Sequence, residues 1–175
     1  MTMTPALRKF TLVVHIASSV GWFGAAAAYI GLDVAAAASQ DVQLVRAAYL
    51  AMELIALYVI VPLALAALLT GLVMSLGTKW GLIRHYWVLI SFLLTVVAVA
   101  VLLAETQTIS YLADEAAGAS DDDLLALEST LVHSIGGTLV LLVVLALNVY
   151  KPRGLTRYGW RKQQEVRQRR TSHDA

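Results

Sequence analysis

The chain has 175 residues, of which 59% are apolar and only 14% are charged, and its mean hydropathy is +0.71. An ordinary soluble domain has roughly half apolar and about a quarter charged residues, so this composition indicates a membrane protein instead. The net charge is +1 and the chain contains no cysteine. The lack of cysteine excludes disulfides, thiolate metal sites and cysteine nucleophiles, and leaves His, Met or oxygen atoms to hold any metal.

Four apolar stretches are long enough to cross a bilayer as helices, because a hydrocarbon core of ~30 Å needs ~20 residues at helical rise. In chain order they cover residues 10–32, 49–76, 86–103 and 131–150. Pro62 interrupts the backbone hydrogen bonds of the second span and predicts a kink there. We therefore predict an all-α fold, a four-transmembrane-helix antiparallel bundle formed by residues 1–152, followed by a basic tail at 153–175.

The connections on the outer side are predicted to be helical, so that the helices extend beyond the outer interface. Residues 35–38 are alanines with high helix propensity, and the polar turn at 39–41 supplies a helix cap. A second hairpin turn is expected near Gly118. Ser120 and Asp123 form a variant of the capping box, which predicts a helix that runs without interruption into the fourth span.

The basic residues predict the orientation of the chain. If the chain crosses four times, all of them except Arg46 fall on one side of the membrane, and the positive-inside rule makes that side the cytoplasm. They are Arg8, Lys9, Lys79, Arg84, Lys151, Arg153, Arg157, Arg161, Lys162, Arg167, Arg169 and Arg170. We expect both termini to be cytoplasmic in a bacterial cytoplasmic membrane. The basic tail is expected to lie on anionic headgroups and not to bind nucleic acid.

Polar groups inside a bilayer are costly, so each is a candidate for function. In the first span, His15 begins a stripe of polar, small and aromatic residues at helical spacing, which should face the interior of the bundle. The other members are Ser18, Ser19, Trp22, Ala25, Ala26 and Tyr29. Two interpretations stay open: a close helix-packing face in which His15 bonds to a neighbouring backbone, or a cofactor site in which His15 is a ligand.

The other histidines lie near the ends of spans. His133 begins the fourth span from the outer side, and Gly136 and Gly137 leave room beside it for a flat cofactor or for helix packing. A carboxylate at Glu53, near the outer end of the second span, is a candidate partner for it, and Met52 offers a soft sulfur ligand.

Depth decides which histidines can share one metal. At 1.5 Å per residue the backbones of His15 and His133 differ in height by roughly 20 Å, so one haem iron cannot bind both. His85, at the cytoplasmic edge of the third span, shares a leaflet with His15, and these two can in principle ligate one iron.

Several motifs resemble those of a family of small bacterial four-span membrane proteins of unknown function, over nearly the whole chain. The motifs are His15 to Gly24 in the first span, Tyr86-Trp87 at the start of the third, Leu147 to Gly154, and Thr156 to Arg161. The His-(x)6-Trp-x-Gly pattern is also similar, more distantly, to copper-resistance D-type membrane proteins and to membrane haem-containing protoporphyrinogen oxidases. The latter similarity implies that His15 ligates haem, whereas Ser91 stands where that family has a third-span lysine.

The leading hypothesis is a membrane protein that binds a b-type haem or a related redox or metal centre, and copper is an alternative. The candidate cofactor-binding residues are His15, Ser18, Trp22 and His85, and the candidate metal ligands are His133, Glu53 and Met52. The rival hypothesis is a non-enzymatic small permease for a metal or hydrophobic solute, or an accessory subunit of a membrane complex, with residues 121–123 as an acidic outer surface. Gly and Ala faces permit a homodimer within the lipid bilayer. The sequence does not decide whether the protein is an enzyme.

Overall fold

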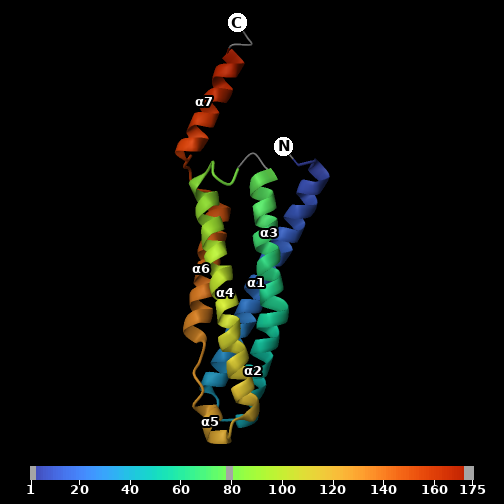
Figure 1. Cartoon of the computed structure of the whole chain (residues 1–175), viewed down its shortest axis with the longest axis vertical. Coiled ribbons are helices and arrows are strands. Elements are labelled where there is room, and N and C mark those ends of the chain that lie inside the picture. Colours follow the sequence, from blue (N-terminus) through green and yellow to red (C-terminus); the bar gives the residue numbers. More distant parts are fainter. Residues whose placement is uncertain (1–2, 78–80, 172–175) are drawn as a thin grey trace.

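The computed structural model describes residues 3–77 and 81–171 and is a bundle of long antiparallel helices (Figure 1). The elements are α1 (Pro5–Ala38), α2 (Val42–Ile55), a π-helical turn (Ala56–Ile60), α3 (Val61–Gly77), α4 (Tyr86–Gly118), α5 (Asp121–Leu125), α6 (Leu131–Tyr150) and α7 (Arg157–Thr171). Because α2, the π turn and α3 are continuous, the described residues contain four helical segments that are long and apolar enough to cross a membrane. The predicted all-α, four-span fold is confirmed.

The first three of these segments are longer than a bilayer requires. They contain 34, 36 and 33 residues, or about 50 Å each at helical rise, against a hydrocarbon core of ~30 Å. The fourth, α6, has 20 residues and matches the core without excess. The extension beyond the membrane is therefore built by the α1–α2 hairpin and the end of α4.

Local caps fix the first hairpin where the sequence predicted it. Helix α1 ends at Ala38, and the Asp41 carboxylate accepts hydrogen bonds from the N–H groups of Gln43 (2.9 Å) and Leu44 (3.4 Å) at the start of α2. Such a side chain satisfies N–H groups that have no partner within the helix.

The second hairpin differs from the prediction. Helix α4 ends at Gly118, and the Ser120 hydroxyl accepts from the Asp123 N–H at 3.4 Å, as the capping box predicted. However, α5 ends at Leu125, and α6 begins only at Leu131. The prediction of one uninterrupted helix into the fourth span is therefore wrong, for a tertiary reason given below.

The second span contains a π-helical turn that ends two residues before Pro62. The N–H of Val61 bonds to the carbonyl of Ala56, five residues earlier. A π turn absorbs an extra residue and is a recognised cause of helix bending. Helix α3 then continues from Val61 to Gly77 without a break.

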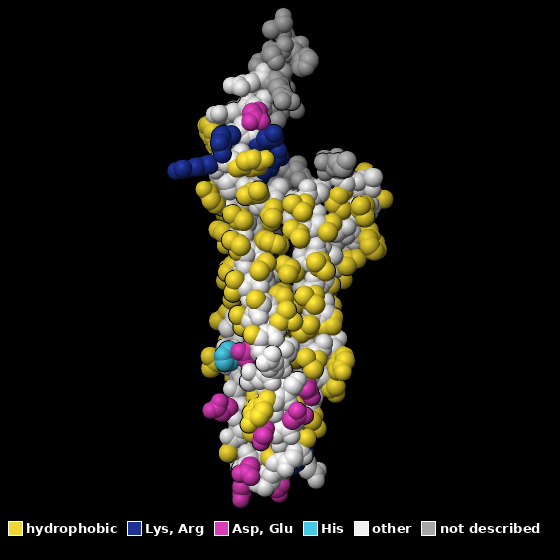
Figure 2. All heavy atoms as spheres, in the orientation of Figure 1, with side chains coloured by type: hydrophobic (Ala, Val, Ile, Leu, Met, Phe, Trp, Pro, Cys, Tyr) yellow, Lys and Arg dark blue, Asp and Glu magenta, His cyan; other side chains and the backbone are white. Residues whose placement is uncertain are grey.

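Most of the core lies between α1, α4 and the continuous helix that α2, the π turn and α3 form together. Its buried residues alternate large aromatics such as Trp22 and Tyr29 with small residues such as Ala64 and Ala67, and small residues let membrane helices approach closely. Helix α6 packs against α1 and α4 but has no buried residue. Hydrophobic side chains cover the middle of the molecule in Figure 2, with Lys and Arg gathered at the α7 end and Asp and Glu at the other end.

After α6, the connection formed by residues 151–156 pairs with the segment that precedes α4, and we call this connection the clip. Lys151 ends α6 in the left-handed conformation (φ 46°). The N–H of Tyr86 then donates to the Gly154 carbonyl (3.3 Å), and the N–H of Thr156 donates to the Arg84 carbonyl (3.0 Å). Helix α7 follows and projects away from the bundle (Figure 1). Lys79 and residues 172–175 of the predicted tail lie outside the described residues.

Candidate functional site

The polar stripe of α1 faces the interior, as predicted. Ser18, Trp22 and Tyr29 are buried, and His15 is partly buried between α1 and α3. The stripe continues at the same spacing to Asp33, which has no exposed surface at all. Two polar sites therefore occur on one face of α1, one around His15 and one around Asp33.

The His15 imidazole bridges α1 to α3 through one ring nitrogen. Its Nδ1 lies 3.1 Å from the Ala67 carbonyl oxygen and 3.0 Å from Thr70 Oγ1. The Thr70 hydroxyl donates its own proton to the Ala66 carbonyl at 2.6 Å, so both atoms facing Nδ1 are acceptors. These partners assign the proton to Nδ1 and leave the Nε2 lone pair without a role in the α1–α3 contact.

A glycine on α3 makes room for this ring. A Cβ atom built on Gly71 would lie 3.1 Å from His15 Cε1, closer than a side-chain contact normally allows. The imidazole thus fills space that a side chain at position 71 would need. Gly71 lies within the predicted second span, 49–76. The sequence carries no sign that His15 packs on it, because the two positions are far apart in the chain.

The other candidate cofactor residues have contacts of their own. The Ser18 hydroxyl donates to the His15 carbonyl within α1 at 3.1 Å, and Trp22 packs in the hydrophobic core. His85 is the residue before α4, where it bridges to Leu155 of the clip and its ring lies 6.4 Å from that of Trp87. The hydrogen bonds described for the His15 ring are with Ala67 and Thr70 of α3.

One further polar atom in this half of the bundle is relevant to a cofactor. In α4, the Ser91 hydroxyl is buried and has no hydrogen-bond partner among the described residues. His15 and Ser91 lie on the order of 15 Å and 8 Å from the starts of their helices, and both helices start at the end of the bundle that carries the termini.

The described contacts of the candidate outer metal ligands are with other residues. His133 Nε2 lies 3.8 Å from Glu105 Oε1 of α4, so Glu105 is the carboxylate within ion-pairing distance and Glu53 is not. Met52 is 1% exposed and packs in the core. Within residues 3–77 and 81–171, no group of three or more His, Asp or Glu side chains is close enough to share a metal ion.

The site that sequence analysis missed is a hydrogen-bonded cluster around Asp33, which we call the Asp33 cluster. Each carboxylate oxygen accepts from one hydroxyl, Ser129 Oγ at 2.8 Å and Thr130 Oγ1 at 2.6 Å. The Tyr29 hydroxyl lies 3.0 Å from Thr130 Oγ1 and donates to it, since the Thr130 proton goes to Asp33. The Tyr49 hydroxyl donates to the Glu128 carbonyl at 3.2 Å and completes the cluster.

The Asp33 cluster explains why the helix is interrupted between α5 and α6. Hydroxyl side chains that bond elsewhere compete with helical backbone structure, and here Ser129 and Thr130 turn inward to a carboxylate on α1. The Ser129 hydroxyl also accepts from the Leu131 N–H (3.2 Å) at the start of α6. The signal that could have revealed the cluster is the position of Asp33 four residues after Tyr29, on the buried stripe.

Arg46, the exception to the distribution of basic residues, has a structural role. Its guanidinium donates to the carbonyls of Ala116 (2.7 Å), Ala117 (2.8 Å) and Ala119 (3.0 Å) at the end of α4. Carbonyls at a helix C-terminus lack intrahelical partners and carry partial negative charge, which a cation stabilises. Arg46 therefore ties α2 to the C-terminus of α4.

Comparison with known proteins agrees with this architecture. A family model described as "Predicted integral membrane protein (DUF2269)" matches residues 9–152, which is most of the chain. No curated protein and no solved structure matches the chain. The matched range contains His15, Asp33, the last three membrane-spanning segments and the first one from residue 9 onward, and it ends at the start of the clip.

Proposed function

The chain belongs to the DUF2269 family of integral membrane proteins, and on that premise we propose that it holds a b-type haem, or a related redox or metal centre, through Nε2 of His15. We further propose that it resides in the bacterial cytoplasmic membrane with both termini in the cytoplasm. The orientation is supported by the Lys and Arg residues around the clip and α7, and by the Asp and Glu residues at the opposite end of the bundle (Figure 2).

The observation that carries the cofactor proposal is the hydrogen bonding of Nδ1. A histidine that ligates a metal almost always donates its other ring N–H to a carbonyl or carboxylate, which fixes the tautomer and the orientation of the ring. His15 has this arrangement, with Ala67 and Thr70 as acceptors. The imidazole is thus held in the tautomer that has a lone pair on Nε2.

The residues present would supply one protein ligand to a haem. His15 supplies the imidazole, and the unpartnered Ser91 hydroxyl is a polar group in the same half of the bundle that a bound cofactor can satisfy. When bound, a b-type haem supplies one-electron redox chemistry. The residues of this chain would hold it, exclude water from it and set the basicity of its histidine ligand through Ala67 and Thr70.

A redox spectrum of the purified protein tests the proposal. Protein in mild detergent should show a Soret band that shifts on addition of dithionite, and His15→Gly should lose that band. Exogenous imidazole should restore it in His15→Gly, because a free imidazole can occupy the vacated space as a ligand. A variant that lost the band only through misfolding would not recover in this way.

His85→Ala is the matched control, since it removes the other histidine in the same half of the bundle. If His15 is the ligand, His85→Ala keeps the band while His15→Gly loses it. A colourless wild-type protein that also takes up no added haem would contradict the proposal. That outcome would favour the non-enzymatic permease or accessory subunit, and a search for a co-purifying solute or partner would follow. The outer copper site at His133 stays a prediction that titration with copper can test.

A further inference from the structure

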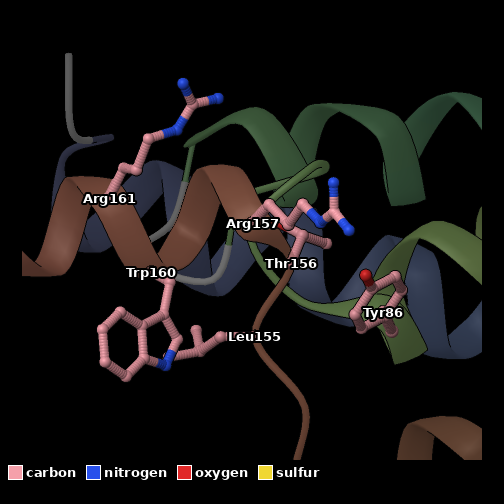
Figure 3. A pocket seen from close by; sticks show the side chains of 6 residues that line it. All are labelled: Tyr86, Leu155, Thr156, Arg157, Trp160 and Arg161. Atoms are coloured by element: carbon pink, nitrogen blue, oxygen red, sulfur yellow. The ribbon is translucent and has the colours of Figure 1, made fainter.

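A groove opens where α7 leaves the clip and α4 begins. It has a volume of about 530 Å³ and is lined by Tyr86, Leu155, Thr156, Arg157, Trp160 and Arg161 (Figure 3). Small-molecule sites usually have volumes of ≈ 300–1,000 Å³, so the groove has room for the headgroup of a phospholipid. We refer to it as the clip groove.

The clip holds the walls of this groove in place. The Thr156 hydroxyl donates to the Ile83 carbonyl (2.5 Å) and accepts from the Gly159 N–H (3.1 Å), so it joins the segment before α4 to the first turn of α7. Gly159 packs directly on the Arg84 backbone, where a Cβ atom would collide with the carbonyl oxygen. The first turn of α7 is therefore fixed relative to the start of α4.

The charge of the groove comes from two arginines, Arg157 and Arg161. Arg157 and Arg161 lie one turn apart on α7, and Figure 3 shows both side chains extending to the same side of the helix. Among the described side chains, the acid in this region, Glu165, pairs with Lys162 at 3.2 Å, and no carboxylate lies within ion-pairing distance of Arg157 or Arg161. Guanidinium groups bind phosphate oxygens in a bidentate way and are suited to such anions.

The rest of the groove is aromatic and lies at the edge of the apolar surface. Tyr86 begins α4, and the Trp160 ring is turned away from the arginines toward Leu155 (Figure 3). Tyr86 and Trp160 are 49% and 59% exposed, and such amphipathic rings are typical of the level of lipid headgroups. Below the groove, α4 and α6 pack side by side and expose apolar residues such as Ile90 and Val149.

We propose that the clip groove binds the phosphate of an anionic phospholipid from the leaflet that faces the termini. The two guanidinium groups contact the phosphate, and Tyr86 lies beside the headgroup. The Trp160 ring, on the other side of α7, anchors this helix at the level of the headgroups, and the acyl chains run along the exposed apolar surfaces of α4 and α6. This site is independent of the cofactor proposed above, because its residues lie outside the α1–α3 contact. It gives the basic tail a specific lipid contact in addition to its general attraction to negative surfaces.

Lipid binding to the full chain in neutral detergent tests the proposal. Native mass spectrometry or calorimetry should show a saturable site for short-chain phosphatidylglycerol, with weaker binding of phosphatidylcholine of the same chain length. The double variant R157Q/R161Q should lower the affinity for phosphatidylglycerol roughly tenfold or more, since each basic residue near a lipid surface contributes appreciably to binding. Added salt should weaken the binding further.

Two control variants make the result specific. R8Q/K9Q removes the same charge from exposed residues at the start of α1, at the same end of the bundle, and it should keep the affinity within about twofold, because distant exposed charges are screened by salt. R157K/R161K keeps the charge but loses the bidentate geometry, so its affinity should fall between those of the wild type and R157Q/R161Q. Unaltered thermal unfolding would show that each variant is folded.

Three outcomes would overturn the proposal. Equal losses in R157Q/R161Q and R8Q/K9Q would indicate attraction by net charge alone. Equal affinity for phosphatidylcholine would show that the negative headgroup is not recognised. If inorganic phosphate displaced phosphatidylglycerol at a similar concentration, the groove would bind the free anion as tightly as the lipid, and the acyl chains and the rest of the headgroup would add nothing to the affinity.

Discussion

Asp33 shows how one residue on a helix stripe can determine a distant piece of backbone. Its carboxylate has no exposed surface and is satisfied by the hydroxyls of Ser129 and Thr130. No positively charged side chain is needed, because each carboxylate oxygen has a hydroxyl donor. Buried polar groups are tolerated when every one of them is hydrogen-bonded in this way.

Asp33→Ala should therefore destabilise the protein. The substitution leaves the buried Thr130 hydroxyl without its acceptor, and an unsatisfied buried group typically costs about 1–3 kcal/mol. Thermal unfolding in detergent should show a lower midpoint for Asp33→Ala. The control Asp114→Ala, which removes an exposed acid, should leave the midpoint unchanged. Equal midpoints in the wild type, Asp33→Ala and Asp114→Ala would mean that the Asp33 cluster adds no stability.

Among single residues, His15 shows the limit of reading chemistry from a sequence. Helical spacing predicted that it faces the interior, and the structure confirms this. The acceptors on α3 that hold Nδ1 could not be predicted, because nothing in the spacing of the first span says which turn of the second span lies against it. The tautomer of His15 is therefore information that comes from the packing of two helices.

At the level of elements, the end of α4 depends on an arginine from another helix. Arg46→Gln should loosen this helix end, because it removes charged donors to three carbonyls, and hydrogen bonds to charged groups contribute about 1.5–3 kcal/mol in general. Hydrogen exchange of the amides at 113–119 should be faster in Arg46→Gln. Gln43→Ala, an exposed change on the same helix, should leave that exchange as it is.

The docking of α7 depends on a glycine at one position and not at another. Gly159→Ala should release α7 from the clip, because the new Cβ atom would collide with the Arg84 backbone. Gly154→Ala is the matched control, since its Cβ would make only an ordinary contact with Tyr86 at 3.6 Å. Limited proteolysis should cut the 151–156 connection faster in Gly159→Ala alone. If both variants resisted cleavage equally, the close contact at Gly159 would not hold α7.

For the whole molecule, the orientation in the membrane is directly testable, and the absence of native cysteine makes the test clean. Asp122→Cys reports on α5 and Gln163→Cys on α7, which lie at opposite ends of the bundle (Figure 1). A membrane-impermeant maleimide should label Asp122→Cys in spheroplasts, and Gln163→Cys only after permeabilisation. The reverse pattern would place the termini outside and contradict the positive-inside interpretation.

The four spans and the first hairpin were predictable because their causes are local. A membrane span is a run of apolar residues of a certain length, and a cap such as Asp41 acts within three residues of itself. The boundaries predicted for the fourth span, 131–150, coincide with α6. The capping box at Ser120 was also correct as a helix start, although it predicts nothing about where that helix ends.

The amino-acid sequence by itself determined which segments cross the membrane, where the first hairpin turns and which face of α1 is buried, since hydropathy, caps and helical spacing are properties of neighbouring residues. Only the tertiary structure decided the break before α6, the partners of His15 and Arg46, and the clip that positions α7. Those features rest on hydrogen bonds between residues as far apart as Asp33 and Thr130, 97 positions away. A contact of this kind forms only after the helices have packed, so it leaves no periodic pattern in the chain.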